Sequence, residues 1–336
     1  MNLSLEAAQS LVIRALVVSG VSPATAAIVA AALVAAEADG LIGHGLARLP
    51  AYADQAVVGK VKAIATPVLR RTAPGALMVD ADGGFAYPAI IMGLKAAEDI
   101  VRDMGVVGLG IVNSHHFGAA GYHIEPLANR GLMALAFSNA PASIAPWGGT
   151  KSLFGTNPIA FACPSGRDHP LVIDLSISKV ARGKLMVAVQ RNEPIPEGWA
   201  LDPDGKPTQD AKVGLAGTMI PMGDAKGAAL ALMVEILAAG LTGANFGYEA
   251  SSFLDAEGSP PLIGQFFLII DPQRFGGASV VPRIAELGGE ILKQQGTRLP
   301  GSRRLEMRTK AQAEGITIPD ALYKEIEKRA ERVTPP

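Results

Sequence analysis

A histidine and an arginine four residues apart are the clearest candidates for acid–base chemistry in this sequence. His44 and Arg48 lie in the segment DGLIGHGLARLP, residues 39–50. If a helix begins near His44, both side chains project from one face of its first turn, because residues four apart are neighbours on a helix. An arginine binds a carboxylate through two parallel hydrogen bonds, and an imidazole exchanges protons near neutral pH. The pair therefore suits a carboxylate substrate whose reaction moves a proton. The alternative is a capping histidine beside a surface arginine.

A second cluster of polar residues follows the apolar segment 106–112. The sequence NSHHFGAAGY, residues 113–122, leads from this predicted strand into a predicted helix. The start of a helix exposes unpaired N–H groups, and phosphates of cofactors bind there. His115 and His116 are adjacent, so on an extended chain their side chains point to opposite faces, and one metal rarely takes both. We therefore predict a cofactor loop and no metal site.

Two further turns contain groups that suit a cofactor. In FGTNP, residues 154–158, Thr156 and its neighbouring Asn could bind an amide or a ribose, or could simply cap the turn. In DLSISKVARGK, residues 174–184, three cations lie within six residues after a predicted strand. A solvated helix face is the alternative interpretation of this second pattern.

Two turns suit phosphate groups. In PMGDAKG, residues 221–227, glycines allow close approach of the backbone to a phosphate, and Lys226 could neutralise its charge. The turn RLPGSRR, residues 298–304, carries three arginines and suits an additional phosphate. An ordinary exposed loop would also look like this turn.

The elements that position these turns alternate in type through the middle of the chain. A Pro-Gly turn predicts strands on either side of it at 68–71 and 76–79, and short, mostly apolar segments predict strands at 106–112, 133–138, 159–162, 171–174 and 266–270. Helical spacing and capping residues predict helices at 3–18, 22–39, 46–58, 88–104, 119–130, 184–190, 225–241, 281–295 and 320–332. This order predicts an α/β fold. We expect a helical lobe from both chain ends, residues 1–62 plus 280–336, and an α/β domain over residues 63–279.

Composition excludes several classes of protein. The 336 residues are 49% hydrophobic and 18% charged with a net charge of −1, so a large core is expected, and neither a nucleic acid nor a membrane is an expected partner. Cys163 is the only cysteine, which excludes a disulfide within the chain. The most apolar stretch, residues 26–36, is shorter than the roughly 20 residues that span a bilayer. We expect a cytoplasmic enzyme.

The usual motifs of large enzyme classes are missing. No G-x-G-x-x-G follows a first strand and opens a helix, because GVVGLG at 105–110 lies ahead of and within a strand. No Walker sequence, H-E-x-x-H or G-x-S-x-G occurs either. A standard Rossmann domain, a P-loop enzyme, a zinc protease and a typical serine hydrolase are therefore disfavoured.

Taken in order, the segments resemble the malate/L-lactate dehydrogenase family of non-Rossmann nicotinamide enzymes. The resemblance runs from about residue 8 to residue 325 and rests on DGLIGHGLARLPAY, NSHHFGAAGYH, LFGTNPIAFACP, DLSISKVARGK, PMGDAKGAALALMVEILAAGLTGANFG and RLPGSRR. Within the family, SHHF, LAAGLTGANFGYE, GQFFLIIDP and RLPGSRR look most like the Δ1-piperideine-2-carboxylate/Δ1-pyrroline-2-carboxylate reductases.

This resemblance implies an activity and a set of site residues. It implies NADPH-dependent reduction of Δ1-pyrroline-2-carboxylate to L-proline and of Δ1-piperideine-2-carboxylate to L-pipecolate, with NADH as a possible cofactor, by a homodimer whose α/β domain binds the cofactor. His44 matches the family's proton donor, expected to act as an imidazolium, and Arg48 its ligand for the substrate carboxylate. The implied cofactor residues are His116, Phe117, Gly118, Ala119, Ala120, Thr156, Asp174, Leu175, Ser176, Lys226, Arg298, Gly301, Arg303 and Arg304.

Two positions depart from the family pattern. Gly43 stands where the family usually has serine, so no relay through that hydroxyl operates. Lys184 stands where characterised imine reductases can carry aspartate and is what the hydroxyacid dehydrogenases tend to show. An NAD(P)-dependent 2-hydroxyacid dehydrogenase of the malate, lactate or ureidoglycolate type is therefore the alternative function. A non-catalytic ligand-binding protein on the same fold is a third.

Overall fold

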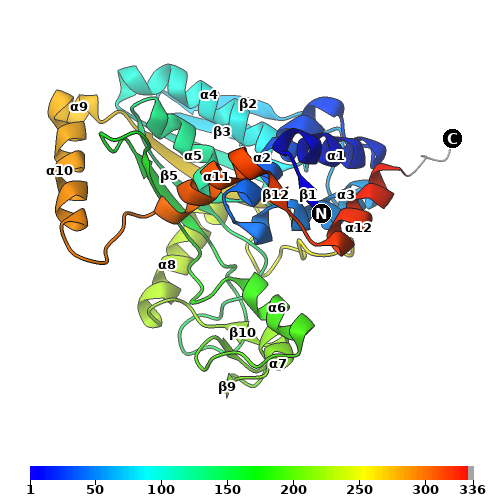
Figure 1. Ribbon diagram of the computed structural model, residues 1–336. Coiled ribbons are helices and arrows are strands. Elements are labelled where there is room, and N and C mark those ends of the chain that lie inside the picture. Colours follow the sequence, from blue (N-terminus) through cyan, green and yellow to red (C-terminus); the bar gives the residue numbers. More distant parts are fainter. Residues whose placement is uncertain (332–336) are drawn as a thin grey trace.

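A seven-stranded mixed sheet forms the centre of the protein, whose computed structural model describes residues 1–331 (Figure 1). The strands are β2 (Val68–Ala73), β3 (Ala76–Asp80), β4 (Val106–Ser114), β5 (Met133–Ser138), β6 (Ile159–Cys163), β7 (Leu171–Leu175) and β11 (Ile263–Ile270). Their order across the sheet is β2-β3-β4-β11-β5-β6-β7. Only β3 and β4 pair in parallel; the other neighbours are antiparallel. All seven predicted strands are confirmed, and the mixed order is not that of a Rossmann sheet.

Helices cover both faces of this sheet. Helices α4 (Ala86–Met104) and α5 (Ala120–Asn129) pack on one face, where the largest apolar cluster lies. Gly93 lets α4 approach β4 closely, because a Cβ there would lie 2.7 Å from a methyl group of Leu109. On the other face, α8 (Ala225–Glu235) and the π-helical turn η3 (Ile236–Gly240) contact β5 and β11.

The chain ends form a helical lobe with its own core. It contains α1 (Leu5–Val18), α2 (Pro23–Ala38), α3 (Leu49–Val58), α11 (Ser302–Glu314) and α12 (Asp320–Ala330). The short strands β1 (Asn2–Leu3) and β12 (Ile316–Thr317) pair the two ends. Ser4 and Ser22 cap α1 and α2, since their hydroxyls accept hydrogen bonds from the backbone of Ala7 and Thr25. Arg332, the last residue of the predicted terminal helix, lies outside the described residues.

One helix of the predicted lobe packs elsewhere. Helix α10 (Val280–Leu292) follows α9 (Gln273–Gly276) and the 3₁₀ turn η4 (Gly277–Ser279), and it projects from the far end of the sheet (Figure 1). None of its residues is buried, and none belongs to the apolar cluster of the lobe. The expected lobe boundary at residue 280 therefore does not match the packing of this helix, because α10 lacks apolar partners among the terminal helices.

A small lower lobe was not predicted. It contains α6 (Arg182–Arg191), α7 (Ala211–Ala216) and a three-stranded sheet of β8 (Ala200–Leu201), β9 (Pro207–Thr208) and β10 (Thr218–Met219). The apolar side chains of this lobe form a separate cluster, which includes Ile144, Leu185 and Ile195. Its strands have two residues each, which is too short for an alternating pattern to show in the sequence. None of the helices in residues 1–331 is long and apolar enough to cross a membrane.

A buried ion network joins α11 to the rest of the protein. Arg308 donates to both Asp39 and Glu125, and Arg304 donates to Glu125 at 2.9 Å. Asp39 and Glu125 are 8% and 6% exposed, in that order. Burial alone would raise the pKa of Glu125, but the hydrogen bonds and charges of the two arginines lower it overall. The network therefore stabilises the fold above the ordinary pKa of glutamate and is lost as the pH falls through the lower folded-state value.

Asp39→Ala should destabilise the protein because it leaves two arginines to share one carboxylate. Removing one partner of a buried ion pair costs about 3–5 kcal/mol, and we expect a loss near the lower end because Arg308 is partly exposed. Urea titration at pH 7.5 measures this loss. Glu286→Ala is the matched control, since its pair with Arg283 lies on the surface of α10 and is worth less than about 1 kcal/mol. Equal stability of the two variants would contradict the assigned role of the network.

Candidate active site

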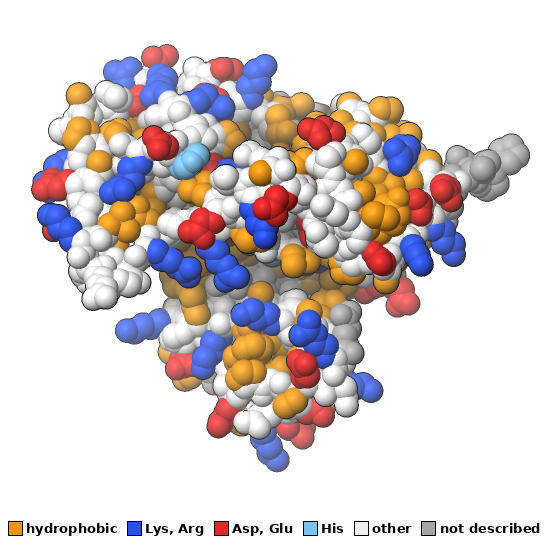
Figure 2. Space-filling view, viewed as in Figure 1, with side chains coloured by type: hydrophobic (Ala, Val, Ile, Leu, Met, Phe, Trp, Pro, Cys, Tyr) orange, Lys and Arg blue, Asp and Glu red, His pale blue; other side chains and the backbone are white. Residues whose placement is uncertain are grey.

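A cavity of about 1970 Å³ opens between the sheet, the helical lobe and the lower lobe. In Figure 2 it corresponds to the hollow below the main body, and Lys and Arg side chains gather along its border. Its walls come from distant parts of the sequence, and they include residues 39–48, 116–120, 138–143, 181–188, 247–254 and 298–304 in large part. The predicted catalytic pair and most predicted cofactor residues therefore meet at one site.

His44 and Arg48 lie on two consecutive 3₁₀ turns and not on an α-helix. The turns are η1 (Ile42–His44) and η2 (Leu46–Arg48), and α3 begins only at Leu49. The expectation of one shared helical turn was wrong. Gly45 breaks the helix because the buried Glu37 carboxylate takes the backbone N–H of Leu46 at 2.8 Å. A Cβ on Gly45 would lie 2.1 Å from that carboxylate, so a larger residue there would displace it from the Leu46 N–H.

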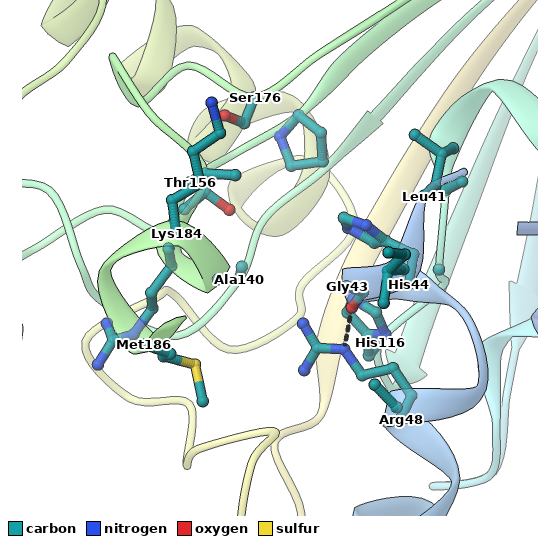
Figure 3. Close-up of a pocket in the computed structure, with 18 of the residues that line it drawn as sticks. Leu41, Gly43, His44, Arg48, His116, Ala140, Thr156, Ser176, Lys184 and Met186 are labelled. Carbon is teal, nitrogen blue, oxygen red and sulfur yellow. Dashed lines mark hydrogen bonds between the residues drawn. The ribbon is translucent and has the colours of Figure 1, made fainter. Parts of the chain in front are cut away.

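Both side chains nevertheless face the cavity (Figure 3). The Nε of Arg48 donates to the backbone carbonyl of Gly43 at 2.6 Å. The other two guanidinium nitrogens have no partner among residues 1–331 and can therefore bind a carboxylate. Gly43 thus has a definite function here although it lacks the serine hydroxyl: its carbonyl orients the arginine.

The local environment keeps His44 neutral. Its side chain is half-buried and lines the cavity. Burial lowers the pKa of His44 to about 4, and the positive charge of Arg48 acts in the same direction. At neutral pH the free protein therefore presents an uncharged imidazole, which accepts a proton more readily than it gives one. This differs from the imidazolium expected from the sequence.

His116 lies against the catalytic histidine. The rings of His44 and His116 are stacked, with centroids 5.7 Å apart and planes inclined by 19°. His115 points away from the cavity into a cage formed by Tyr52, Phe85 and Phe253, where neither ring nitrogen has a hydrogen-bond partner in the described chain. No group of three or more His, Cys, Asp or Glu in residues 1–331 could hold a metal ion.

The loop before α5 only partly fits the expected phosphate site. Gly118 has φ +72° and packs on Tyr87, whose hydroxyl would lie 2.6 Å from a Cβ at that position. The backbone N–H of Gly121, in the first turn of α5, donates to the Asp174 carboxylate at 2.8 Å. A carboxylate at this helix start competes with a phosphate, so the site suits a ribose hydroxyl better.

Most of the remaining predicted cofactor residues line the cavity, and two do not. Thr156, Ser176, Arg298, Gly301 and Arg303 line the cavity, as do Asp174 and residues 116–120. Leu175 and Lys226 are not among the residues that line it. Arg304 also lines the cavity, but its guanidinium is committed to Glu125 and Asp39.

Part of the cavity wall comes from residues that were not predicted as site residues. Residues 138–143, SNAPAS, follow β5 and line the cavity, as do parts of 247–254. The signal for the first segment was present, because small polar residues follow a buried strand there as they do at 113–118. Asn157 in the predicted 154–158 turn is structural, since its amide donates to the buried Glu235 carboxylate at 2.7 Å.

An imidazole and a guanidinium with two unbonded nitrogens line a cavity large enough for a dinucleotide, an arrangement that suits an oxidoreductase. The family model described as malate/L-lactate dehydrogenase matches residues 3–327. The chain belongs to the malate/L-lactate dehydrogenase family.

The relatives of this chain within the family are named either as a dehydrogenase or as reductases. The chain is 50% identical to the (2R)-3-sulfolactate dehydrogenase (NADP(+)) of Chromohalobacter salexigens, over 96% of both chains. It is 39% identical to the Δ1-pyrroline-2-carboxylate/Δ1-piperideine-2-carboxylate reductase of Pseudomonas aeruginosa, over 97% of this chain and 98% of the relative. The crystal structure of Δ1-piperideine-2-carboxylate reductase from Pseudomonas syringae matches with a TM-score of 0.93 at 37% identity, over 98% and 99% of the two chains. The predicted family, fold class and enzyme class are confirmed, whereas the substrate differs among relatives.

Proposed function

We propose that this protein oxidises a 2-hydroxy acid with a second anionic group, of the 3-sulfolactate type, to the 2-oxo acid with NADP⁺, and catalyses the reverse reduction. The observation that carries this proposal is the open Arg48 guanidinium beside His44, with the cations Arg182 and Lys184 on the same cavity. Oxidation of an alcohol requires a base for the hydroxyl proton, and an uncharged imidazole is such a base at neutral pH.

The residues of the pocket have separate roles in this reaction. Arg48 binds the substrate carboxylate through the two nitrogens that Gly43 leaves free. His44 accepts the proton of the C2 hydroxyl during oxidation and returns it to the C2 oxygen during reduction. The nicotinamide, when bound, supplies the acceptor or donor of the hydride that C2 loses or gains.

A second anion of the substrate has cationic partners across the cavity. Lys184 and Arg182 both line it, and Figure 3 shows Lys184 on the wall opposite His44 and Arg48. Neither cation pairs with a carboxylate of the described chain, and the buried Nε of Arg182 has no hydrogen-bond partner there. Lys184 lies 5.9 Å from the centre of the Trp199 ring. Unpaired cations in a cavity favour an anionic ligand, and the relative at 50% identity is named for a substrate with a sulfonate and a carboxylate.

The cavity fits a nicotinamide dinucleotide phosphate. Arg298 and Arg303 are exposed at its border and make no ion pair with residues 1–331, so they suit the 2′-phosphate of NADP. Asp174 and Thr156 supply acceptors and a donor for ribose or amide groups on the inner wall. Lys226 is not needed for this arrangement. NADH as a second cofactor and a homodimeric assembly stay predictions.

Reduction of a cyclic imino acid is the second candidate, because the solved structure of an imine reductase superposes with a TM-score of 0.93. In that reaction Arg48 would bind the same carboxylate. The substrate would arrive as its protonated iminium, because a pKa of about 4 leaves little of His44 as an imidazolium at neutral pH.

Steady-state assays with both substrate classes test the proposal. We expect kcat/KM for 3-sulfolactate with NADP⁺, and for 3-sulfopyruvate with NADPH, to exceed the values for lactate and pyruvate, which lack the second anion. Faster turnover of Δ1-pyrroline-2-carboxylate or Δ1-piperideine-2-carboxylate than of every hydroxy or oxo acid would overturn it.

The pH dependence of oxidation follows from the lowered pKa of His44. The base is the neutral form, so activity falls only as the pH drops through about 4. Because kcat/KM reports the pKa values of free enzyme and substrate, it should stay flat between about pH 7.5 and 5.5. Initial rates of hydroxy-acid oxidation, taken at each pH in buffers of constant ionic strength, measure this profile. A decline centred near the ordinary histidine value of about 6.5 would contradict the assigned state of His44.

A further inference from the structure

A chain of buried hydrogen bonds runs behind the catalytic histidine. The hydroxyl of Tyr52 lies 2.6 Å from Nδ1 of His116 and 3.2 Å from the hydroxyl of Tyr87. Tyr52 and Tyr87 are 0% and 1% exposed, in that order. The three groups come from α3, α4 and the loop after β4, so the chain links the helical lobe to the wall of the active site.

The direction of these hydrogen bonds is determined by which hydrogens must be paired. Within residues 1–331, the Tyr87 hydroxyl has Tyr52 as its only hydrogen-bond partner. If Tyr52 donated to Tyr87, the hydrogen of Tyr87 would be buried without an acceptor, at a cost of about 1–3 kcal/mol. If Tyr87 donates to Tyr52, and Tyr52 to Nδ1 of His116, both hydroxyl hydrogens are paired. The second arrangement is therefore the stable one.

This direction fixes the tautomer of His116. Burial, followed by the charge of Arg48, holds the pKa of His116 well below its ordinary value, so the ring is neutral. A neutral imidazole whose Nδ1 accepts a hydrogen bond carries its proton on Nε2. In the described chain Nε2 has no partner, and it is not among the buried polar atoms left without one, so it retains access to the cavity that His116 lines.

We propose that His116 is a second catalytic residue that donates its Nε2–H to the C2 oxygen of the substrate, and that Tyr52 and Tyr87 are positioning residues that hold it in this tautomer. The stacked rings place this donor beside His44, the group that exchanges a proton with the same oxygen. Negative charge develops on that oxygen when the proton leaves ahead of the hydride, and a fixed donor stabilises it. This assignment rests on the proposed function for the identity of the oxygen, and it differs from the cofactor role that the resemblance implies for His116.

The tautomer is measured directly by NMR of the full chain with ¹⁵N-labelled histidine. The sequence has five histidines, and the spectrum of His116→Gln identifies the resonances of His116 by their loss. We expect the Nε2–H pattern for His116 in the wild type and a mixture of tautomers in Tyr52→Phe. Tyr323→Phe is the matched control, because it removes a hydroxyl that bonds Glu327 on the outer helix α12. An Nδ1–H pattern in the wild type would overturn the proposal, whether or not any variant folds.

Two amide variants test the donor itself. Glutamine places its amide near the position of Nε2, and asparagine places its amide near Nδ1. Loss of one preorganised donor lowers kcat by roughly 10²–10³-fold, so we expect His116→Asn to show that loss and His116→Gln to recover about 10-fold of it. NADPH affinity should stay within about twofold in both, because the donor contacts the substrate. Equal kcat in the two variants, or a loss of NADPH binding that accounts for the defect, would overturn the proposal.

These readouts separate the two proposals. If the assays show imine reduction but the NMR spectrum shows the Nε2–H tautomer, the proposed function fails and the tautomer assignment stands. The Nε2–H of His116 would then face the imine nitrogen of the substrate. If hydroxy acids are turned over but His116 carries its proton on Nδ1, the function stands and the inference on His116 fails.

Discussion

His44→Ala should lower kcat for hydroxy-acid oxidation by about 10²–10⁴-fold, the range typical for loss of a general base. The neutral imidazole is the proton acceptor of the pocket, and Arg48 beside it carries a permanent positive charge that cannot replace it. Binding of NADPH, followed by its fluorescence, should change little, because the groups proposed to bind the cofactor, Thr156, Asp174, Arg298 and Arg303, come from other segments of the chain. Single-turnover rates with saturating substrate measure the effect on the chemical step.

His169→Ala is the matched control for this prediction. His169 is exposed after β6, and it does not line the cavity. Its removal should leave kcat within about twofold of the wild type. If His44→Ala kept more than about a tenth of the wild-type kcat, His44 would not be the base.

Arg48→Met should act mainly on substrate affinity. It keeps an unbranched side chain of similar bulk near the backbone but removes the guanidinium group that faces the cavity. Loss of one partner of a desolvated charge pair costs about 2–4 kcal/mol, so kcat/KM should fall roughly 30- to 700-fold, largely through KM. Arg48→Lys should recover only part of the loss, because lysine lacks the two-pronged geometry and cannot keep the bond to Gly43 in the same way.

The control for Arg48 is Arg70→Met on the edge strand β2. Arg70 is exposed and lies outside the cavity lining, so its removal should not change KM. A ligand without a carboxylate provides a second check, since its binding should not depend on Arg48. An unchanged KM for 3-sulfolactate in Arg48→Met would show that the carboxylate is bound elsewhere.

The sheet could be predicted from the sequence because each strand is a short apolar segment between turn residues. All seven strands lie at the predicted places, and β5 has the predicted ends. Segments such as 133–138 are buried on both sides of the sheet, so their apolar character is continuous and easy to recognise. The strand order was not accessible, because pairing of β11 between β4 and β5 depends on contacts more than 120 residues apart in sequence.

The site was predictable in its residues and less so in its geometry. The spacing of His44 and Arg48 suggested one helical turn, but the Glu37 carboxylate, which lies several residues earlier, takes a backbone N–H and leaves two 3₁₀ turns. The Asp174 contact with Gly121 could not be inferred either, because it joins a strand and a helix through residues 53 positions apart. Local patterns identify residue types, while long-range hydrogen bonds decide where each group points.

The chemistry of the site depends even more on burial than on spacing. A histidine in the sequence carries an expected pKa of about 6.5, and that value led to an imidazolium as proton donor. The surrounding protein lowers the pKa of His44 to about 4. Lys184 on the opposite wall is the reason that we propose the hydroxyacid dehydrogenase, the alternative expectation, ahead of imine reduction, the first expectation.

A crystal structure of the protein with NADP⁺ and an unreactive 3-sulfolactate analogue tests the central claim most directly. The account predicts the analogue's carboxylate on Arg48, its C2 oxygen within hydrogen-bonding distance of His44, and its sulfonate toward Lys184 and Arg182. A complex with the nicotinamide and the analogue bound away from His44 and Arg48 would contradict it.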